Sequence, residues 1–518
     1  MTAPASASRP RFSPTALALV LSIGLAGMIF LTFGRALEFE GAILDDGRNL
    51  LLNPHVGSFS PTDVGWALQP DLSYVPRYMP LGWLGIDLQL VLFGLSPFSR
   101  HLVLLVLHGV NSIGLGWVIL RFLRAQGFSL THRTVWSAFL AAALHALHPL
   151  RAELAAWSSC AIWQRPIALL LLWAWFRTGR RPRPVAEAIT YLISLLFYPV
   201  GLGLAPGLFL SEGLVSGWRA SWRRNLPILA VAAACGAVTV IIASHGAPSG
   251  QAAAFPLIRR LLQALAIEGR AIGALFVPLG LNPYVQPLDR LMAGNPVEIA
   301  GAIGLTFAAL FSLTKNGRPL RPWIVVFVFL VAPFTWVTSW QNPQIPDRYF
   351  APAHLLLAFG LGYLLARQKG PTLAVVTGLA VIGAQVLAHE ATRIWRDEAA
   401  LFTAVEANLD RSDTDYVERR AFMHYHLALD LYDRGQHPEA LAAIAEAVAA
   451  APGNAAYRSA ERAMRAGETH PSPTVIQHQQ IVSAALAAGE TGKAQMHIAE
   501  IQRLDPGFYT RPQGHSRP

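Results

Sequence analysis

The sequence predicts an all-α, polytopic membrane protein followed by a soluble helical domain. Hydrophobic residues make up 53% of the 518 residues and charged residues only 14%, and the mean hydropathy is +0.38. A soluble protein of this length usually carries about a quarter charged residues. Long apolar runs alternate with short, arginine-containing loops, a pattern that is typical of membrane-spanning helices.

The first apolar run sets the topology. Residues 14–33 have the length, about 20 residues, that a helix needs to cross a bilayer. Arg9 and Arg11 precede this run, so the positive-inside rule places the N-terminus in the cytosol. The run is too long for the core of a signal peptide and lacks a clear small-x-small cleavage site. We therefore expect a retained membrane anchor.

Later arginine clusters mark further cytosolic turns, and the apolar runs between them pair as hairpins. With the first run they give about eleven spans. The later spans are expected at 101–120, 134–148, 160–176, 185–198, 200–217, 226–244, 295–313, 322–340, 351–366 and 371–388. An odd number of spans places the chain after about residue 389 on the outer face.

We therefore divide the chain into a transmembrane domain, 1–390, and a soluble domain, 391–518. The transmembrane domain has two large outer loops, at about 34–100 and 245–294. The second loop contains four arginines, which long loops tolerate on the outer side. Within the first loop, residues 81–93 are apolar but carry Asp87, which favours a helix lying in the interface or a re-entrant segment.

The soluble domain is rich in alanine and shows an internal repeat of tetratricopeptide (TPR) type, with a period of about 34 residues. The first register contains Leu427, Ala428, Gly435, Ala440, Ile444, Ala447 and Pro452, and the second contains Ile481, Gly489, Ala494, Ile498 and Pro506. Small residues allow paired helices to pack closely. A generic helical hairpin is the alternative. Repeat arrays of this kind bind peptides or protein partners, so this domain indicates recognition rather than chemistry.

Charge and cysteine content exclude other classes. The net charge is +10, but the arginines are concentrated in short loops between apolar runs, so they report topology and not nucleic-acid binding. Cys160 and Cys235 lie in or beside apolar segments and indicate neither a disulfide framework nor a metal knuckle.

Two adjacent carboxylates, Asp45 and Asp46, follow the first span on the outer face. Such a pair can accept a proton from a substrate or hold a divalent metal; a solvated turn is the alternative. His145, His148 and Glu153 have a spacing reminiscent of zinc ligands. Pro149 breaks the helix between them, however, so we expect His148 to cap the loop or form hydrogen bonds within it.

Several short motifs follow one another in a specific order. They are Asp45–Val56 (DDGRNLLLNPHV), Pro80–Trp83 (PLGW), Leu92–Leu95 (LFGL), His101–His108 with Asn111, His145–Glu153 (HALHPLRAE), Pro346–Tyr349 (PDRY) and Trp395–Phe402 (WRDEAALF). As an ordered set they resemble the TPR-bearing polytopic members of the GT-C glycosyltransferases. This group contains the eukaryotic transmembrane O-mannosyltransferases and many bacterial relatives.

The resemblance implies a polyprenyl-phosphate-linked sugar donor and a protein, glycan or lipid acceptor at the outer face. Asp45 or Asp46 is then the general base, and Glu153 is a further catalytic candidate. Positive charge beside the leaving phosphate would come first from Arg348, then from Arg77 or Arg165. Supporting roles fall to Asp347, Tyr349 and His148. A protein partner would bind the TPR repeats, and use of a divalent metal stays open.

The chain departs from the family pattern at three places. Ser158–Arg165 stands where relatives often carry an Arg and an Asp, Tyr198 replaces a common lysine, and Met79 replaces a His or Arg before Pro80. These changes keep a second reading open, a catalytically inactive scaffold that assembles an envelope complex through its repeats. A transporter is disfavoured because the spans show no internal symmetry between halves.

The residue bias also bears on location. Abundant Ala, Leu and Arg together with compact loops favour a bacterial inner membrane, with the outer face in the periplasm. In a eukaryote the same topology would place the site in the lumen of the endoplasmic reticulum.

Overall fold

The computed structural model describes residues 13–41, 44–69, 74, 77–179, 181–245, 257–278, 280–281, 287–337, 346–407, 416–466 and 473–509. Helices account for 82% of the structure, and no β-strand occurs within these ranges. The prediction of an all-α protein is confirmed.

Eight helical segments in the described ranges are long and apolar enough to cross a membrane. They contain α1 (Pro14–Phe33), α5 (Pro97–Ala125), α8 (Ala161–Arg177), α11 (Trp218–His245), α14 (Pro296–Leu313), α15 (Arg321–Val337), α16 (Ala351–Arg367) and α17 (Thr372–Ala391). This set is compatible with a multi-pass membrane protein. Helices α6 (His132–Ala146), α9 (Pro184–Phe197) and α10 (Leu204–Ser216) are shorter, so the count of about eleven spans stays a prediction.

Local sequence explains where the long helices begin. Ser13 caps α1 by accepting a hydrogen bond from the Ala16 amide, and Pro14 occupies the first turn. Ser96 and Pro97 do the same for α5. A serine cap satisfies an amide that has no intrahelical partner, and proline fits a position whose amide needs none. These caps fix the residues at which α1 and α5 begin.

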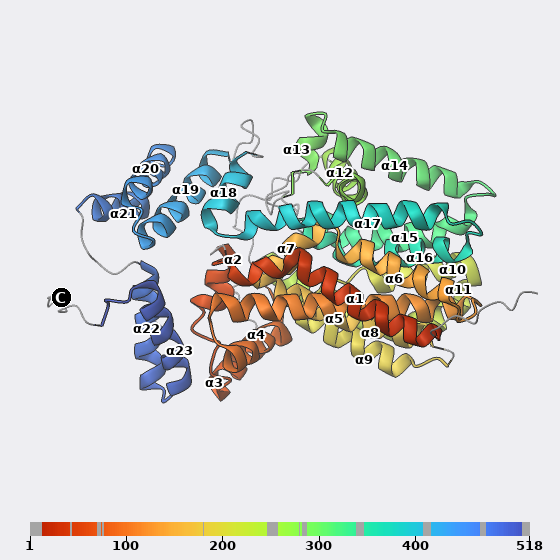
Figure 1. The fold of residues 1–518 in the computed structure, drawn as a ribbon, viewed down its shortest axis with the longest axis horizontal. Coiled ribbons are helices and arrows are strands. Elements are labelled where there is room, and N and C mark those ends of the chain that lie inside the picture. Colours follow the sequence, from red (N-terminus) through yellow and green to blue (C-terminus); the bar gives the residue numbers. More distant parts are fainter. Residues whose placement is uncertain are drawn as a thin grey trace, which may run out of the picture.

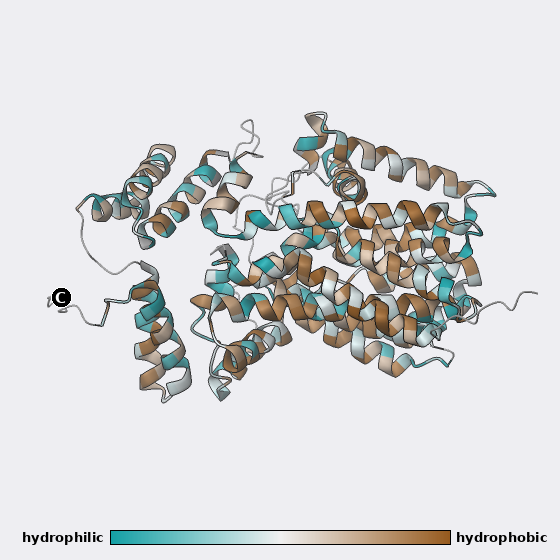
Figure 2. Ribbon diagram, in the orientation of Figure 1, coloured by the Kyte–Doolittle hydropathy of each residue, from teal (hydrophilic) through white to brown (hydrophobic). Residues whose placement is uncertain are grey.

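The long helices form a bundle with an apolar outer surface. They run roughly side by side in Figure 1, and hydrophobic residues cover their sides along the bundle in Figure 2. Ile23 on α1 is 74% exposed and Phe307 on α14 is 69% exposed. Apolar surface of this extent is unfavourable in water, and a lipid environment removes that cost.

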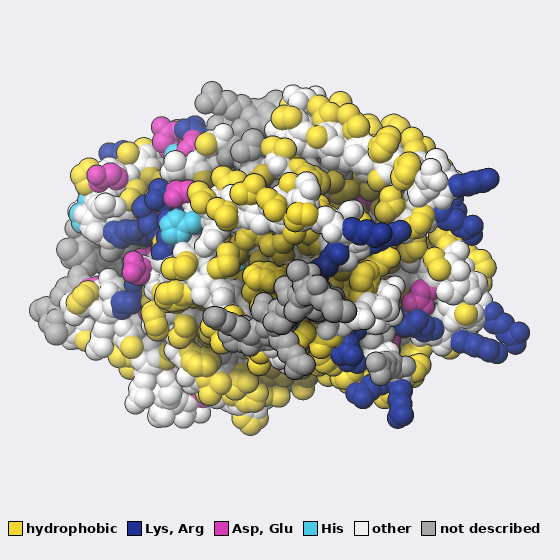
Figure 3. All heavy atoms as spheres, turned by 45° about the vertical axis from the view of Figure 1, so that its right-hand side comes forward, with side chains coloured by type: hydrophobic (Ala, Val, Ile, Leu, Met, Phe, Trp, Pro, Cys, Tyr) yellow, Lys and Arg dark blue, Asp and Glu magenta, His cyan; other side chains and the backbone are white. Residues whose placement is uncertain are grey.

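The two ends of the bundle differ in charge. Lys and Arg side chains gather at one end (Figure 3), and the loops that join α8 to α9 and α16 to α17, together with the first turns of α11, contribute them. The opposite end carries α2 (Leu44–Asp46), α7 (Ala152–Ala156) and the C-terminal helices (Figure 1). The candidate site residues therefore lie at the end away from the basic loops.

The first outer loop is largely helical. After α2 come a π-helical turn (Gly47–Leu51), α3 (Pro61–Leu68) and α4 (Pro80–Phe93). Helix α4 forms in the segment expected as an interfacial or re-entrant helix. Leu92 on α4 is 61% exposed, whereas Asp87 is buried and accepts hydrogen bonds from the amides of Gly57 (2.6 Å) and Phe59 (3.0 Å). Asp87 therefore connects α4 to the loop that follows Asp46 in the chain.

The second outer loop also contains regular structure, namely α12 (Leu257–Phe276) and α13 (Pro287–Met292). Helix α12 crosses α14 at very close range, because glycines line both helices at the contact. A Cβ atom added to Gly301 on α14 would lie 1.8 Å from the carbonyl oxygen of Gly269 on α12. In Figure 1, α12 is seen nearly end-on, across the direction of α14 and α17.

The C-terminal domain consists of α18 (Glu398–Glu406), α19 (Tyr416–Asp433), α20 (His437–Ala450), α21 (Ala455–Arg465), α22 (Pro473–Ala487) and α23 (Thr491–Leu504). Helices α19–α20 and α22–α23 form antiparallel hairpins, each with a small apolar core. Their turns contain Gly435 (φ 74°) and Gly489 (φ 76°), a left-handed conformation that favours glycine. Both glycines belong to the repeat pattern, but assignment as TPR units stays a prediction.

Candidate active site

The adjacent aspartates Asp45 and Asp46 occupy different environments on α2. Asp45 is exposed, whereas Asp46 is fully buried. The Oδ1 atom of Asp46 accepts two hydrogen bonds from Ser159, one from its amide (2.7 Å) and one from its Oγ (2.5 Å). The Oδ2 atom lies 3.5 Å from Nη1 of Arg100. Asp46 therefore anchors α2 to the bundle and leaves Asp45 accessible.

Burial raises the pKa of Asp46 to about 6, and the charge of Arg100 and the hydrogen bonds from Ser159 limit this rise. At neutral pH the group is mostly ionised. Its ionised oxygens are occupied by protein donors and are closed to solvent, so Asp46 is poorly placed to take a proton from a substrate.

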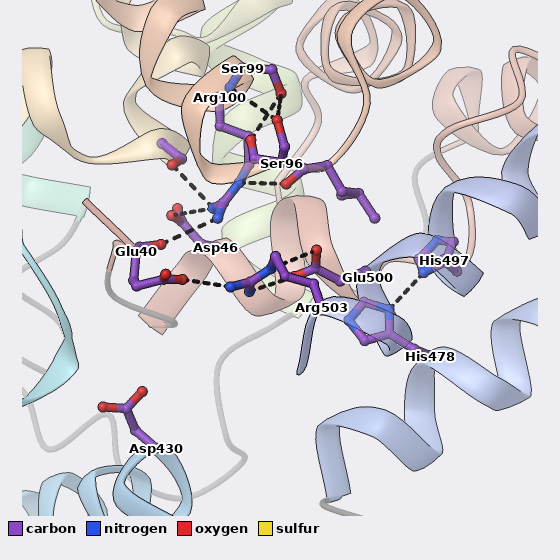
Figure 4. A network of polar contacts seen from close by, with 12 residues as sticks. Glu40, Asp46, Ser96, Ser99, Arg100, Asp430, His478, His497, Glu500 and Arg503 are labelled. Carbon is purple, nitrogen blue, oxygen red and sulfur yellow. Dashed lines mark hydrogen bonds and ion pairs between the residues drawn. The ribbon is translucent and has the colours of Figure 1, made fainter. Parts of the chain in front are cut away.

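Arg100 organises this end of the bundle. Besides Asp46, its guanidinium donates to the carbonyl of Leu95 (Nε, 3.0 Å), to Oγ of Ser158 (3.3 Å) and to the carbonyl of Glu40 (3.3 Å) (Figure 4). The sequence argument missed this residue. An arginine at the outer end of a span runs against the positive-inside pattern, and that exception is the signal that would have found it.

The serine pair Ser158–Ser159 lies where the resemblance to GT-C glycosyltransferases had led us to expect a charged pair. In the structure, Ser159 holds Asp46 and Ser158 accepts from Arg100. The segment therefore contributes to the site through hydroxyl and amide groups.

Asp45 interacts electrostatically with two guanidinium groups, those of Arg77 and Arg348. The structure thus brings together three of the residues predicted from the sequence. Arg77 is exposed and its guanidinium carbon lies 5.9 Å from the ring centroid of Tyr198. Among the described residues, no carboxylate lies within ion-pairing distance of Arg77, so no ion pair compensates its charge there.

Arg348, in contrast, is neutralised by a buried carboxylate. The structure pairs Glu153 with Arg348. The Arg348 amide donates to Glu153 Oε2 (3.1 Å), and Nη1 forms an ion pair with Oε1. Burial raises the pKa of Glu153, while Arg348 opposes this rise. Glu153 is therefore a partner for Arg348 rather than a free acid or base.

Aromatic rings fix the plane of the Arg348 guanidinium. Its carbon lies 4.6 Å from the ring centroid of Trp157, 5.5 Å from that of Trp163 and 5.3 Å from that of Tyr349. Contacts of this kind stabilise a buried cation. Tyr349, predicted as a supporting residue, thus packs directly against Arg348.

Asp347 belongs to a second buried network. Arg270 on α12 holds both carboxylate oxygens of Asp347 at 3.0 Å and reaches Glu298 at 3.0 Å. Arg290 adds a contact of 2.9 Å to Glu298. Asp347 therefore links the segment that carries Arg348 to α12. Arg270 was not a candidate from the sequence, because it lies in an outer loop whose structure the pattern did not predict.

The remaining candidates lie apart from Asp45. His148 caps a short 3-10 helix by accepting a hydrogen bond from the Leu150 amide (3.3 Å). Its Nε2 atom lies 3.0 Å from the Leu275 carbonyl oxygen. Burial and the charge of Arg151 lower the pKa of His148 to about 4. Arg165 donates to Oε1 of Gln89 on α4 at 2.5 Å. Within the described residues, no group of three His, Cys, Asp or Glu side chains is arranged to hold a metal.

Comparison with known proteins gave no match to a family model, a curated protein or a solved structure. The sequence motifs and the geometry of the site are therefore the basis for a functional assignment.

Proposed function

We propose that the protein is a membrane glycosyltransferase of GT-C type. It would transfer a sugar from a polyprenyl-phosphate donor to a protein, glycan or lipid acceptor at the outer face of the membrane, which is the periplasmic face in a bacterium. The observation that supports this most directly is the exposed carboxylate of Asp45, which attracts the guanidinium groups of Arg77 and Arg348 electrostatically. This arrangement lies at the end of the bundle opposite the basic loops (Figures 1 and 3).

The proposed reaction needs a base and a cation. Asp45 takes the proton of the acceptor hydroxyl as the acceptor oxygen attacks the anomeric carbon of the sugar. The bond between that carbon and the donor phosphate oxygen breaks, and its electron pair leaves with the polyprenyl phosphate. Guanidinium groups stabilise this anion. No acid is required, because the leaving phosphate is already a stable anion.

The geometry changes the order of the candidates. Asp45 is the better base because it is exposed, and Asp46 positions it. Arg77 is the better phosphate ligand, because the charge of Arg348 is compensated by Glu153. Arg348 would then act mainly through electrostatic attraction, in an orientation fixed by its aromatic neighbours. Glu153 holds Arg348, and Arg165 supports α4.

An aromatic cluster lies beside Arg77 and would border the bound donor. Trp66 stacks on His55 with ring centroids 4.5 Å apart and lies 5.1 Å from Trp83. Trp66, Arg77 and Trp83 line the same small pocket. Aromatic faces combine apolar surface with a polar edge, which suits a ligand with both characters.

The wider architecture fits the same proposal. The basic loops would face the cytosol, with about eleven spans between them and the outer face. The C-terminal hairpins, as TPR-like units, would recognise the acceptor or a partner protein.

Binding of the leaving group tests the proposal without knowledge of the sugar or acceptor. Native mass spectrometry of the purified protein should detect polyprenyl phosphate binding. Arg77→Gln should weaken it about 10- to 100-fold, because a charge-assisted hydrogen bond is lost. Arg219→Gln, which removes an exposed arginine at the basic end, is the matched control and should bind as wild type does. Equal binding by the two variants would contradict the role of Arg77, and no binding by wild type would favour an inactive scaffold.

A further inference from the structure

The C-terminal hairpin α22–α23 packs against the outer loop that carries the aspartate pair. In Figure 1 the hairpin stands at the end of the bundle beside α2, α3 and α4. Met496 on α23 lies so close to the loop that a Cβ atom on Gly57 would be 2.6 Å from its Cε. The contact therefore involves the loop backbone itself.

Lys493 makes the more buried of two polar contacts. Its side chain is 3% exposed, and Nζ donates to the Pro54 carbonyl at 2.6 Å. The same atom lies 3.4 Å from Oδ1 of Asp63 and 3.3 Å from Oε2 of Glu490. A buried ammonium group is costly unless it is paired and hydrogen-bonded. Both partners in the loop therefore contribute to keeping α23 in this place.

Arg503 makes the second contact, and it leads directly to Asp46. Nη1 of Arg503 lies 2.7 Å from Oε2 of Glu40, and Glu500 holds the other side of the guanidinium at 2.8 Å. The backbone carbonyl of Glu40 accepts from Arg100, which pairs with Asp46. Figure 4 shows this continuous chain of polar contacts from α23 to Asp46.

The rest of the soluble domain holds the same loop. The amide of Gly41 donates to the carbonyl of Arg396 at 3.1 Å, and Gly41 forms an isolated bridge with Asp397. Residues 40–63 are thus held near both ends by the chain that follows the last membrane helix.

Apolar side chains do not fill all of the space between the hairpin α22–α23 and the outer loop. A cavity of about 720 Å³ lies between α4 and α23, lined by residues that include Leu90, Phe93, Lys493 and Arg503. Because the two elements do not share a filled apolar core there, the polar contacts have to supply much of the attachment.

We propose that α22–α23 is a positioning element for the loop that carries Asp45 and Asp46, with Lys493 and Arg503 as the residues that hold it. This role is separate from recognition of a partner or acceptor. It rests on the proposed function only in naming what is positioned, namely the base for sugar transfer.

Hydrogen–deuterium exchange of the full chain in lipid nanodiscs tests the proposal independently of activity. Lys493→Met should raise amide exchange in residues 44–63 by at least about 100-fold, because a buried partner of Asp63 is lost. Lys493→Arg keeps the charge and should restore much of the protection. Arg503→Gln, at a more exposed pair, should raise exchange near Glu40 about 2- to 5-fold. Arg465→Gln, which breaks an exposed pair with Glu461 on α21, should leave the loop unchanged.

The proposal is supported if the Lys493→Met variant loses protection locally in residues 44–63 while exchange in the membrane helices is unchanged. Unchanged protection of the loop overturns it. If Lys493→Met does not fold, the same decision is made by comparing amide exchange near Glu40 in Arg503→Gln with that in the control Arg465→Gln. If the loop is released but sugar transfer is unaffected, the positioning contact stands and the assignment of the base to this loop fails.

Discussion

Two identical neighbours, Asp45 and Asp46, occupy different environments because different parts of the chain surround them. The sequence identifies the pair and its position at the outer membrane boundary. It does not identify which carboxylate is buried, because the partners come from elsewhere: Arg100 is 54 residues away and Ser159 is 113 residues away. Likewise, Arg348 is recognisable from its motif, but its neutralisation by Glu153 depends on the packing of distant segments.

Asp46 should make stability depend on pH. Because its pKa is raised to about 6, the folded protein keeps the Asp46 proton where the unfolded chain releases it. The stabilising contribution is full below about pH 4, falls as the pH rises to about 6, and is level above that. It amounts to about 3 kcal/mol in total.

Asn at this position lacks the titration, so the wild type should lose stability relative to Asp46→Asn between about pH 4 and pH 6. Unfolding of both proteins in mixed micelles across this range measures the difference. A wild-type-minus-variant difference that does not change with pH would contradict the assigned environment of Asp46.

At the scale of elements, the lengths of the apolar runs and the arginine clusters between them predicted most of the long apolar helices. The segments at 14–33, 185–198, 295–313 and 351–366 agree with α1, α9, α14 and α16 within a few residues. Helix α12 was not predicted from the sequence. Its segment contains Arg270 and other charged residues, so it lacks the continuous apolar run of a membrane span. Its contact with α14 depends on glycines from two segments, and the sequence alone gives no reason to pair them.

Gly301→Ala should destabilise the protein by about 1–3 kcal/mol, because the new methyl group would force α12 and α14 apart. Displacement of α12 should also loosen the Arg270–Asp347 pair. Gly304→Ala is the matched control on the same helix, since a Cβ atom there has no neighbour within 4 Å. It should be neutral, or more stable by up to about 1 kcal/mol. Thermal unfolding in detergent compares the two, and equal stability of both variants would argue against the close contact.

At the scale of the whole molecule, composition predicted a membrane domain and a soluble helical domain, and the structure has apolar helices and C-terminal hairpins in those places. Nothing in the amino-acid pattern indicates that the hairpin α22–α23 contacts the loop containing Glu40 and Asp63. Lys493 and Arg503 look like ordinary surface residues of an Ala-rich helix, and only the folded chain brings them to Asp63 and Glu40.

The charge asymmetry of the bundle predicts orientation. Alkaline phosphatase fused after residue 509 should be active in a bacterial host, because that end lies opposite the basic loops. Green fluorescent protein inserted in the loop between α8 and α9 should be fluorescent, as it is in the cytosol. The reverse pattern would contradict the proposed topology and place Asp45 on the cytosolic face.

Comparative mass spectrometry of envelope glycoproteins, glycolipids and polysaccharides tests the central claim most directly. A deletion strain is compared with strains restored by wild type, by Asp45→Asn, and by Glu439→Gln as an exposed control on α20, all at matched membrane levels. We expect a sugar-mass difference that wild type and Glu439→Gln restore, whereas Asp45→Asn lowers the product about 100-fold or more, because the general base is lost. Full restoration by Asp45→Asn would show that this carboxylate is not catalytic and would favour an inactive scaffold.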